Sequence, residues 1–334
     1  FYEMRDNIIV DIAEDLSMNR VTGGRAVVSG HIVSNHVDIF AANERGPNFL
    51  YKNVEGSFVD IALEFNLQDV LQNGRGTSLA DVLYRGRLDI ITSNWEGFHR
   101  IFTLNKNSFA DIATLEFREP SKNRTTIVAD FDNDGLLDIY VCVYSAGDNV
   151  EGRGFEVNAP RPFNDAANGG RNVLLKNLGE FGFSDATAAV GLDVDNSRWS
   201  FAAAWEDFDR DGDPDLYVAN DFGRNCLYRN EGGRFQQVAD ELGVEDMASG
   251  MSVAWGDYNR DGDPDLYVGN MFSAAGSRIS RQKLFAADSD PALVGKLRRM
   301  ARGNSLFASD CGRIVPATVP ARKPCPVLNS HMAR

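Results

Sequence analysis

Short apolar runs alternate with turns rich in Gly, Asn and Asp along most of the chain, and these runs recur at a nearly constant spacing. An Asp followed by apolar residues marks each copy, at Asp38, Asp89, Asp138, Asp215 and Asp265. The intervals between these anchors are 51, 49, 77 and 50 residues, and the longest one contains an additional loop near residues 145–170. Self-similarity at such a period indicates a repeat architecture.

Each anchor is followed by a second pair of β-prone runs separated by a turn. Residues 48–53 lead through a turn to residues 58–62, and residues 225–230 lead in the same way to residues 235–239. The turns contain Gly, Asn and Glu, as β-hairpins require. Each repeat therefore indicates four short strands in about 50 residues, and radial repetition of such units forms a β-propeller. The sequence predicts an all-β fold of four-stranded blades.

The period divides the chain into propeller repeats at residues 1–307 and a tail at 308–334. A half-blade is expected at 1–20, because residues 1–16 fit the register of residues 227–242 without a gap. The full blades are expected near residues 21–70, 71–120, 121–195, 196–245 and 246–307. One helix is expected near residues 290–302, where Pro291 can open it and Gly303 can close it.

The tail is expected to be atypical and poorly ordered. Residues 304–307 begin the hairpin that the repeat requires, but the segment that follows shows no second strand. Residues 311–334 contain four prolines and match no repeat. A circularly closed propeller, in which the two end half-blades pair, would remove the open sheet edge. The tail favours the alternative, a fragment with an incomplete ring.

Three anchors complete the pattern D-x-[DN]-x-D-G-x-x-D, whose oxygens can converge on one cation. Gly at position 6 lets the chain curl around the ion because it accepts a positive φ. Position 7 offers its backbone carbonyl and position 9 adds a carboxylate. Roughly six to eight oxygens suit Ca²⁺ better than Mg²⁺, so about three Ca²⁺ ions are expected. The predicted ligands are Asp130, Asp132, Asp134, Leu136, Asp138, Asp207, Asp209, Asp211, Asp213, Asp215, Asp257, Asn259, Asp261, Asp263 and Asp265.

Two other interpretations of these loops are weaker. An EF-hand requires Glu at position 12 and flanking helices, whereas position 12 is Val141, Val218 or Val268 in strand-like runs. A solvated acidic turn is a sufficient explanation for one loop, but not for three loops in register. Asn259 removes one charge from the third loop, which is therefore expected to bind more weakly.

Two further copies of the loop have lost most of the acidic pattern. Residues 81–89 keep positions 1, 6 and 9 but have Arg85 at position 5. We hypothesise that the Arg85 guanidinium replaces the cation and bridges Asp81 and Asp89, because Arg can pair with carboxylates in a bidentate manner. Residues 30–38 keep only the final Asp, and no metal is expected there.

Composition excludes several classes of protein. The chain has 34 Lys and Arg against 48 Asp and Glu, a net charge of −14, which argues against a nucleic-acid binder and suits a protein that collects cations. No run of 18 apolar residues exists, so no transmembrane segment is expected. Cys142, Cys226, Cys311 and Cys325 form no C-x-x-C motif, and the first two lie in apolar runs as expected of buried thiols.

The loops and the strands that follow them resemble the FG-GAP/VCBS repeats of integrin-α-type propellers, and more closely the ASPIC/UnbV group. The resemblance lies in W-E-D-F-D-R-D-G-D-P-D-L-Y-V-A-N from Trp205, its copy from Trp255, P-F-N-D-A-A-N-G from Pro162 and A-R-G-N-S-L-F from Ala301. It covers about residues 1–307. It implies seven blades when the ring is complete, Ca²⁺ in outer loops of the blades, and an extracellular, periplasmic or cell-surface setting.

A propeller fold does not fix function, and two functions stay open. The first is a calcium-binding scaffold for a protein or glycan ligand, without catalysis of its own. The alternative is a propeller-fold enzyme, a lyase or hydrolase, with structural calcium. The sequence contains four His and no H-E-x-x-H, G-x-S-x-G or P-loop motif, which favours the scaffold. Asp165 and Asn168 could line a binding face, although a structured surface loop is the simpler interpretation.

Overall fold

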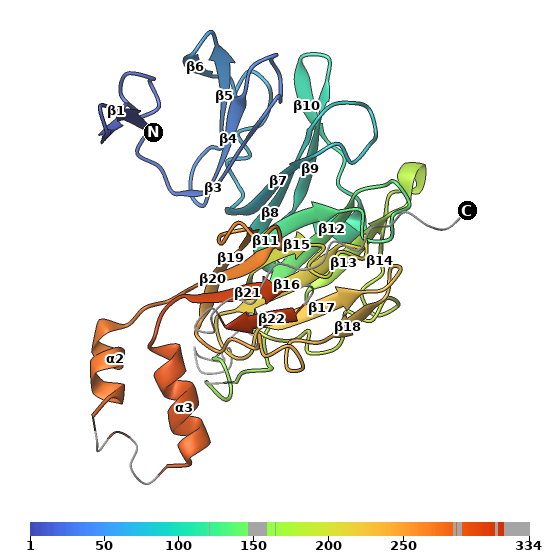
Figure 1. Ribbon diagram of the computed structural model, residues 1–334. Helices are drawn as coiled ribbons and strands as arrows, with labels where there is room; N and C mark the ends of the chain where they lie inside the picture. The colour runs from blue at the N-terminus through green and yellow to red at the C-terminus, as the bar shows by residue number, and fades with distance from the viewer. Residues whose placement is uncertain are drawn as a thin grey trace, which may run out of the picture. The chain divides into compact units, whose positions relative to one another are not determined.

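The computed structural model describes residues 1–119, 121–145, 159–163, 165–282, 285, 289–310 and 313–316, which are almost entirely strands and turns (Figure 1). The chain divides into two compact units, which are described separately. Unit 1 holds the described residues up to 130, together with 134–145 and 170–188. Unit 2 holds residues 131–133 and 159–169 and the described residues from 189 onward.

Unit 1 contains three antiparallel four-stranded blades and an N-terminal hairpin. The hairpin strands are β1 (Tyr2–Arg5) and β2 (Ile8–Asp11). The first blade consists of β3 (Gly24–Gly30), β4 (Asp38–Asn43), β5 (Phe49–Val54) and β6 (Ser57–Asp60). The second consists of β7 (Gly74–Ala80), β8 (Asp89–Gly97), β9 (Arg100–Asn105) and β10 (Ser108–Asp111). The third consists of β11 (Ser121–Ala129), β12 (Asp138–Val143), β13 (Val173–Asn177) and β14 (Phe183–Asp185). A short parallel bridge between β8 and β11 joins the second and third blades. The helical turns α1 (Leu115–Arg118) and η2 (Gly179–Phe181) lie in connections.

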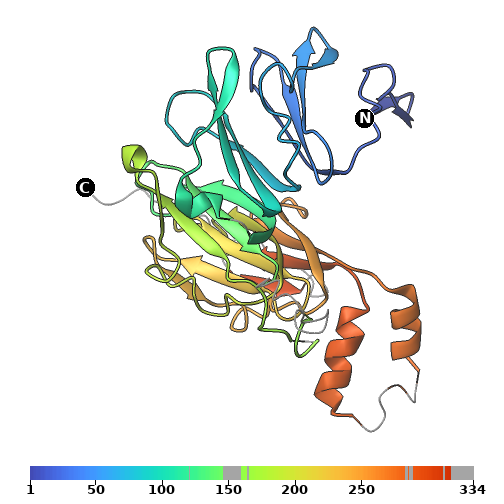
Figure 2. The ribbon, with the colours of Figure 1, turned by 180° about the vertical axis from the view of Figure 1, so that it is seen from behind.

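Unit 2 contains two further blades of the same topology. The first of them consists of β15 (Ser200–Glu206), β16 (Asp215–Asn220), β17 (Cys226–Asn230) and β18 (Phe235–Gln237). The second consists of β19 (Gly250–Gly256), β20 (Asp265–Asn270), β21 (Ser305–Asp310) and β22 (Arg313–Pro316). Two helices, α2 (Ala274–Ser280) and α3 (Pro291–Met300), are inserted between β20 and β21 and lie beside each other (Figure 2). The predicted all-β fold of four-stranded blades is confirmed.

Two local predictions had different outcomes. The predicted helix is α3, which begins at Pro291. Asp290 is its N-cap, and the Asp290 side chain accepts a hydrogen bond from the backbone N of Ala292. The prediction that no second strand follows β21 was wrong, because β22 pairs with it over four residues. The strand has four residues and ends at Pro316, so its apolar pattern is too short to detect.

The cysteines behave as buried apolar residues where they are described. Cys142 and Cys226 are free and buried, and burial raises the pKa of the Cys226 thiol to about 11. Cys311 and Cys325 lie outside the described residues, as does the predicted tail beyond residue 316.

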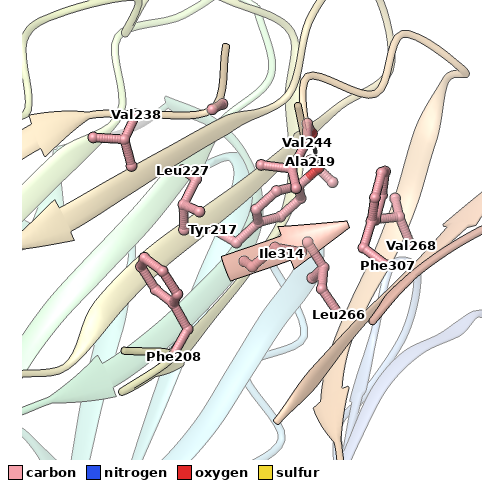
Figure 3. Packing of buried hydrophobic residues seen from close by; sticks show 11 residues of the cluster. Phe208, Tyr217, Ala219, Leu227, Val238, Val244, Leu266, Val268, Phe307 and Ile314 are labelled. Carbon is pink, nitrogen blue, oxygen red and sulfur yellow. Dashed lines mark hydrogen bonds between the residues drawn. The ribbon is translucent and has the colours of Figure 1, made fainter. Parts of the chain in front are cut away.

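Each unit is held together by apolar contacts between neighbouring blades. In unit 2 the aromatic rings of Phe208 and Tyr217, from one blade, belong to the same buried cluster as Leu266, Phe307 and Ile314 from the next (Figure 3). The Tyr217 hydroxyl, buried in this cluster, donates a hydrogen bond to the backbone carbonyl of Val244 at 2.9 Å. The apolar runs that define the repeat therefore supply the contacts that join consecutive blades.

In unit 1 the first strands of the three blades lie alongside one another. Ser78 Oγ on β7 donates to the carbonyl of Thr126 on β11 at 2.6 Å. The backbones approach most closely at Gly76, where an added Cβ would lie 2.5 Å from the backbone N of Thr126. Only glycine fits this position without moving β11.

We expect Gly76→Ala to destabilise the protein, because the extra methyl group forces two first strands apart. Overpacking of this kind costs ~1–3 kcal/mol of unfolding free energy, measurable by urea denaturation. Gly256→Ala is the matched control, since a Cβ at Gly256, also on a first strand, meets no atom within 4 Å. Equal stability of the two variants would show that the close approach at Gly76 is absent.

Candidate metal loops

The three acidic loops share one backbone conformation. Each connects the first and second strands of a blade, at residues 130–138, 207–215 and 257–265. The glycine at position 6 has φ of 90°, 98° and 94° in the three loops, and the residue before position 5 has φ of 54°, 63° and 63°. Gly adopts such angles without steric penalty, so the sequence pattern produces the curl that it predicts.

Aspartates hold this curl through hydrogen bonds to the loop's own backbone. In the second loop, the two oxygens of Asp207 accept from the backbone N of Asp211 at 3.1 Å and of Gly212 at 3.0 Å. Asp130 and Asp257 accept the equivalent pair of bonds at 2.8–3.0 Å. The aspartate at position 1 therefore shapes the loop, and each of its oxygens keeps a lone pair for a cation.

The aspartate at position 9 is buried where the second strand begins. Asp215 is 1% exposed, and its oxygens accept from the backbone N of Asn230 at 2.7 Å and of Phe208 at 3.1 Å. Burial raises the pKa of Asp215 to about 8, and the nearby charges of Asp209 and Asp211 contribute to this rise. The folded loop thus brings carboxyl groups together in a place with little water, where the charged form of Asp215 is unfavourable without a cation.

Carboxylate oxygens converge in two of the loops. One oxygen from each of Asp207, Asp209 and Asp215 lies within 4.8 Å of the others, and Asp130, Asp132 and Asp138 form the same arrangement. Asp209 Oδ1 is buried and receives no hydrogen bond from the described residues. Burial and the charge of Asp211 raise the pKa of Asp209. Converging, desolvated carboxylates with an oxygen still lacking a donor fit a hard divalent cation.

The third loop has the same backbone but a different donor set. Asn259 occupies position 3, where its Oδ1 accepts from the backbone N of Asp261 at 2.8 Å. Its Nδ2 is buried and meets no acceptor in the described part of the chain. Burial raises the pKa of Asp265 at position 9. This loop therefore presents one fewer charged oxygen, and its weaker binding stays a prediction.

The side chains at position 7 interact with the neighbouring loop. Asp213 accepts from Asn133 Nδ2 at 2.8 Å and from the backbone N of Gly232 at 2.6 Å. Asp263 forms an ion pair with Arg210 at 2.7 Å. Position 4 of one loop thus contacts position 7 of the next. The sequence does not reveal these pairs, because they join residues about 50 to 80 positions apart and no local pattern marks them.

The remaining predicted ligands are the aspartates at position 5 and the backbone carbonyl of Leu136 at position 7. Asp134, Asp211 and Asp261 at position 5 are all exposed, and Asp134 forms an ion pair with Lys176 Nζ at 3.0 Å. The backbone N of Leu136 at position 7 donates to Asp134 Oδ1 at 2.9 Å. The backbone carbonyl at position 7 is the oxygen that the sequence pattern assigns to the ion.

The copy with Arg85 keeps the loop backbone. Asp81 accepts from the backbone N of Arg85 at 2.8 Å and of Gly86 at 2.6 Å, as position 1 does in the acidic loops. The Arg85 guanidinium lies 3.3 Å from Asp89 and also contacts Thr103. The hypothesis of a bridge is therefore half correct, since the guanidinium pairs with Asp89 and the backbone, not the guanidinium, binds Asp81.

We expect Arg85→Ala to destabilise the protein whether or not Ca²⁺ is present. Asp89 is 1% exposed and would lose its cation. Removing one partner of a buried pair costs roughly 3–5 kcal/mol, which the partial exposure of Arg85 reduces to ~1–2 kcal/mol. Urea denaturation with and without Ca²⁺ measures this. Arg87→Ala, an exposed arginine in the same loop, is the control, and an equal effect of both variants would refute the pairing.

His99 is the buried histidine of unit 1 and lies at the edge of a cavity of about 230 Å³. The backbone N of Asn94 donates to Nδ1 at 2.9 Å, and Nε2 lies 3.2 Å from Ser121 Oγ and 2.8 Å from Asn123 Nδ2. Burial lowers the pKa of His99 to about 4. The imidazole is neutral at physiological pH and organises the surrounding strands.

The buried His99 predicts a loss of stability in mild acid. Below its ordinary pKa of about 6.5 the unfolded chain takes up a proton that the fold excludes until about pH 4. Between pH 7.5 and pH 5 this removes ~2 kcal/mol of unfolding free energy. In His99→Gln the pH dependence should shrink by that amount, whereas in His31→Gln, at an exposed site, it should not. Urea denaturation at both pH values measures the change in unfolding free energy. The same change in the unmodified protein and in both variants would contradict the prediction.

Asp165 and Asn168 hold the described end of the long insertion, residues 159–163 and 165–169, in place. Asp165 forms ion pairs with Arg198 at 2.8 Å and Arg224 at 3.3 Å. Asn168 Oδ1 accepts from the backbone N of Arg161 at 2.8 Å and from Trp199 Nε1 at 3.2 Å. These contacts are those of a structured surface loop.

Comparisons with known proteins point to the same repeat. The family described as FG-GAP-like repeat matches residues 81–141 and 207–268, which contain the Arg85 loop and all three acidic loops. Cartilage acidic protein 1 of Xenopus tropicalis is 47% identical over 139 residues, covering 40% of this chain and 22% of that protein. The Homo sapiens protein of the same name is 46% identical over 136 residues, covering 39% and 21%. The part of this chain that matches spans about a fifth of the length of those relatives.

Solved structures show only distant similarity. The extracellular domain of a putative hybrid two component system from B. thetaiotaomicron has a TM-score of 0.44 at 10% identity, over 76% of this chain and 26% of that one. The V. cholerae biofilm matrix protein Bap1 has a TM-score of 0.43 at 13% identity, over 78% and 36%. Within the described residues, no helix is long and apolar enough to span a membrane.

Proposed function

We propose that this FG-GAP-repeat chain, a relative of cartilage acidic protein 1, is a calcium-stabilised β-propeller scaffold that binds a protein or glycan outside the cytoplasm. The observation that carries the proposal is the convergence of Asp207, Asp209 and Asp215, with Asp209 Oδ1 buried and lacking a donor among the described residues. Such a set repels itself unless a cation is present.

The proposed ligands follow the repeat position by position. Positions 1, 3, 5 and 9 would supply side-chain oxygens: Asp130, Asp132, Asp134 and Asp138; Asp207, Asp209, Asp211 and Asp215; Asp257, Asn259, Asp261 and Asp265. Position 7 would supply the backbone carbonyls of Leu136, Asp213 and Asp263, since the last two side chains bind the neighbouring loops. A bound ion would neutralise the cluster and fix the ends of two strands.

Several observations support a scaffold over an enzyme. The loops offer mainly protein oxygens at the joints of strands, which suits a structural ion. His99 is buried and neutral, and His31 and His36 are exposed on the degenerate first loop. A setting outside the cytoplasm suits ions of this kind, because modules there bind Ca²⁺ at roughly 10⁻⁴–10⁻³ M.

Calcium should raise the melting temperature of the chelator-treated protein, since the ion binds the folded state alone. A site filled to 100 times its dissociation constant contributes ~2.7 kcal/mol. Differential scanning fluorimetry in EDTA, Ca²⁺ and Mg²⁺ measures the shift, and isothermal titration counts about three ions. An unchanged melting curve after Ca²⁺ addition would sink the proposal.

Single variants then assign the sites. Asp209→Ala should remove one ion from the titration and most of the corresponding thermal shift. Asp240→Ala, an exposed aspartate of the same blade outside the loop, should leave both unchanged. Asn259→Ala should have a smaller effect than Asp209→Ala. An equal calcium count for Asp209→Ala and the unmodified protein would show that the carboxylate cluster holds no ion.

A further inference from the structure

The cavity of about 230 Å³ beside His99 lies within unit 1, between α1 and one face of the third blade. Alternate residues of a strand point to the same side of a sheet, and three strands of this blade each place two of them against the cavity. These residues are Ser121, Asn123, Val141, Val143, Val173 and Leu175. The acidic loop of the blade joins β11 and β12 at the other end of both strands. The cavity is therefore separate from the proposed metal ligands.

Four apolar side chains of low exposure line this cavity. They are Phe117, Val141, Val143 and Leu175, each at most 7% exposed. The polar side chains beside them have partners, since Ser121 Oγ and Asn123 Nδ2 both lie within hydrogen-bond distance of His99 Nε2. A polar group that entered the cavity would lose its water without gaining a free partner on these three residues. The interior therefore favours an apolar group.

The cavity reaches the protein surface and has the size of a side chain. Val173 and Ser121, which line it, are both partly exposed. Its volume of about 230 Å³ is below the roughly 300–1,000 Å³ that is common for small-molecule sites. One aliphatic side chain fits this space. Protein interfaces often contain such an anchor, an aromatic or aliphatic side chain held in a pocket of the partner.

The rim of the cavity is negatively charged. Glu116 and Glu119 line it and are exposed, and neither carboxylate forms an ion pair or hydrogen bond with the residues that the structure describes. Arg171 also lines it, but its charge is balanced by Asp185 at 2.8 Å. Charges around an apolar anchor steer and select the partner. The rim therefore complements a partner that carries positive charges beside its apolar side chain.

We propose that this cavity anchors a protein partner by one aliphatic side chain, a leucine or a residue of similar size, whose neighbours in the partner are basic. The inference rests on the proposed scaffold function and gives its partner a chemical class. A lysine side chain fits the interior less well, because its ammonium group would be buried among apolar walls. A glycan also fits less well, because its hydroxyl groups would find no free partner on His99 or Asn123.

Isothermal titration in saturating Ca²⁺ and low salt tests the proposal with three pentapeptides, each blocked at both ends. The first has a central leucine between two pairs of lysines, the second has glycine in place of leucine, and the third has glutamates in place of the lysines. The first should bind. The other two should bind about tenfold more weakly or worse, because one lacks the apolar anchor and the rim repels the other. No binding of the first peptide, or equal binding of the first two, would overturn the proposal.

A variant that fills the cavity locates the binding. Val173→Phe adds a ring where the cavity meets the surface and should weaken binding of the first peptide about tenfold, because the leucine loses its space. Val59→Phe places the same ring at an exposed position of β6, outside the cavity walls, and should change binding less than about twofold. Equal losses in both variants would contradict the cavity.

A second set of variants tests the rim. Glu116→Gln combined with Glu119→Gln should weaken binding of the first peptide roughly threefold, whereas Glu180→Gln, at an exposed site of unit 1 outside the cavity, should not. If Val173→Phe fails to fold, these variants and the glycine peptide still decide. The calcium-dependent thermal shift is measured on the same samples. A normal shift without peptide binding would refute this inference alone, whereas the absence of the shift would refute the calcium scaffold.

Discussion

The structure depends on one buried carboxylate in each blade, at the first residue of the second strand. Asp38, Asp89, Asp138, Asp215 and Asp265 are all at most 1% exposed. Four of them accept a hydrogen bond from a backbone N of the third strand, at 2.7–2.9 Å from Asn53, Asn177, Asn230 and Ser309. This carboxylate ties the start of the second strand to the third strand, but its burial is costly unless its charge is balanced.

Three kinds of partner offset the cost of burying this carboxylate in the different blades. Asp38 receives backbone N–H donors from Val33 and Ser34 and the Ser34 hydroxyl, so that neutral dipoles surround it. Asp89 receives the guanidinium of Arg85. In the other three blades further carboxylates surround the buried one, an arrangement that suits a cation. The loss of the acidic pattern in two loops is therefore a change of partner for the same buried group.

The sequence was informative where a feature repeats or is local. The buried aspartates appear in it as anchors because their period is regular, and α3 appears because Pro291 and Asp290 mark its start. The short strand β22 escaped detection because it has four residues and ends at a proline. The pairs Asn133–Asp213 and Arg210–Asp263 depend on contacts between distant segments, which no local pattern records.

The contact between Arg210 and Asp263 has a consequence for how neighbouring loops respond to ions. Arg210 also donates to the carbonyl of Gly262, so its guanidinium holds the backbone of the next loop in its curled form. An ion that orders the loop at 207–215 also orders the side chain that clamps the loop at 257–265. Linkage between two binding sites is reciprocal. Ordering of either loop by an ion therefore reduces the conformational entropy that the other loop loses when it binds its own ion. Under the proposed calcium binding, the two loops would therefore respond to the ion as a pair, over a narrower range of concentration than either would alone.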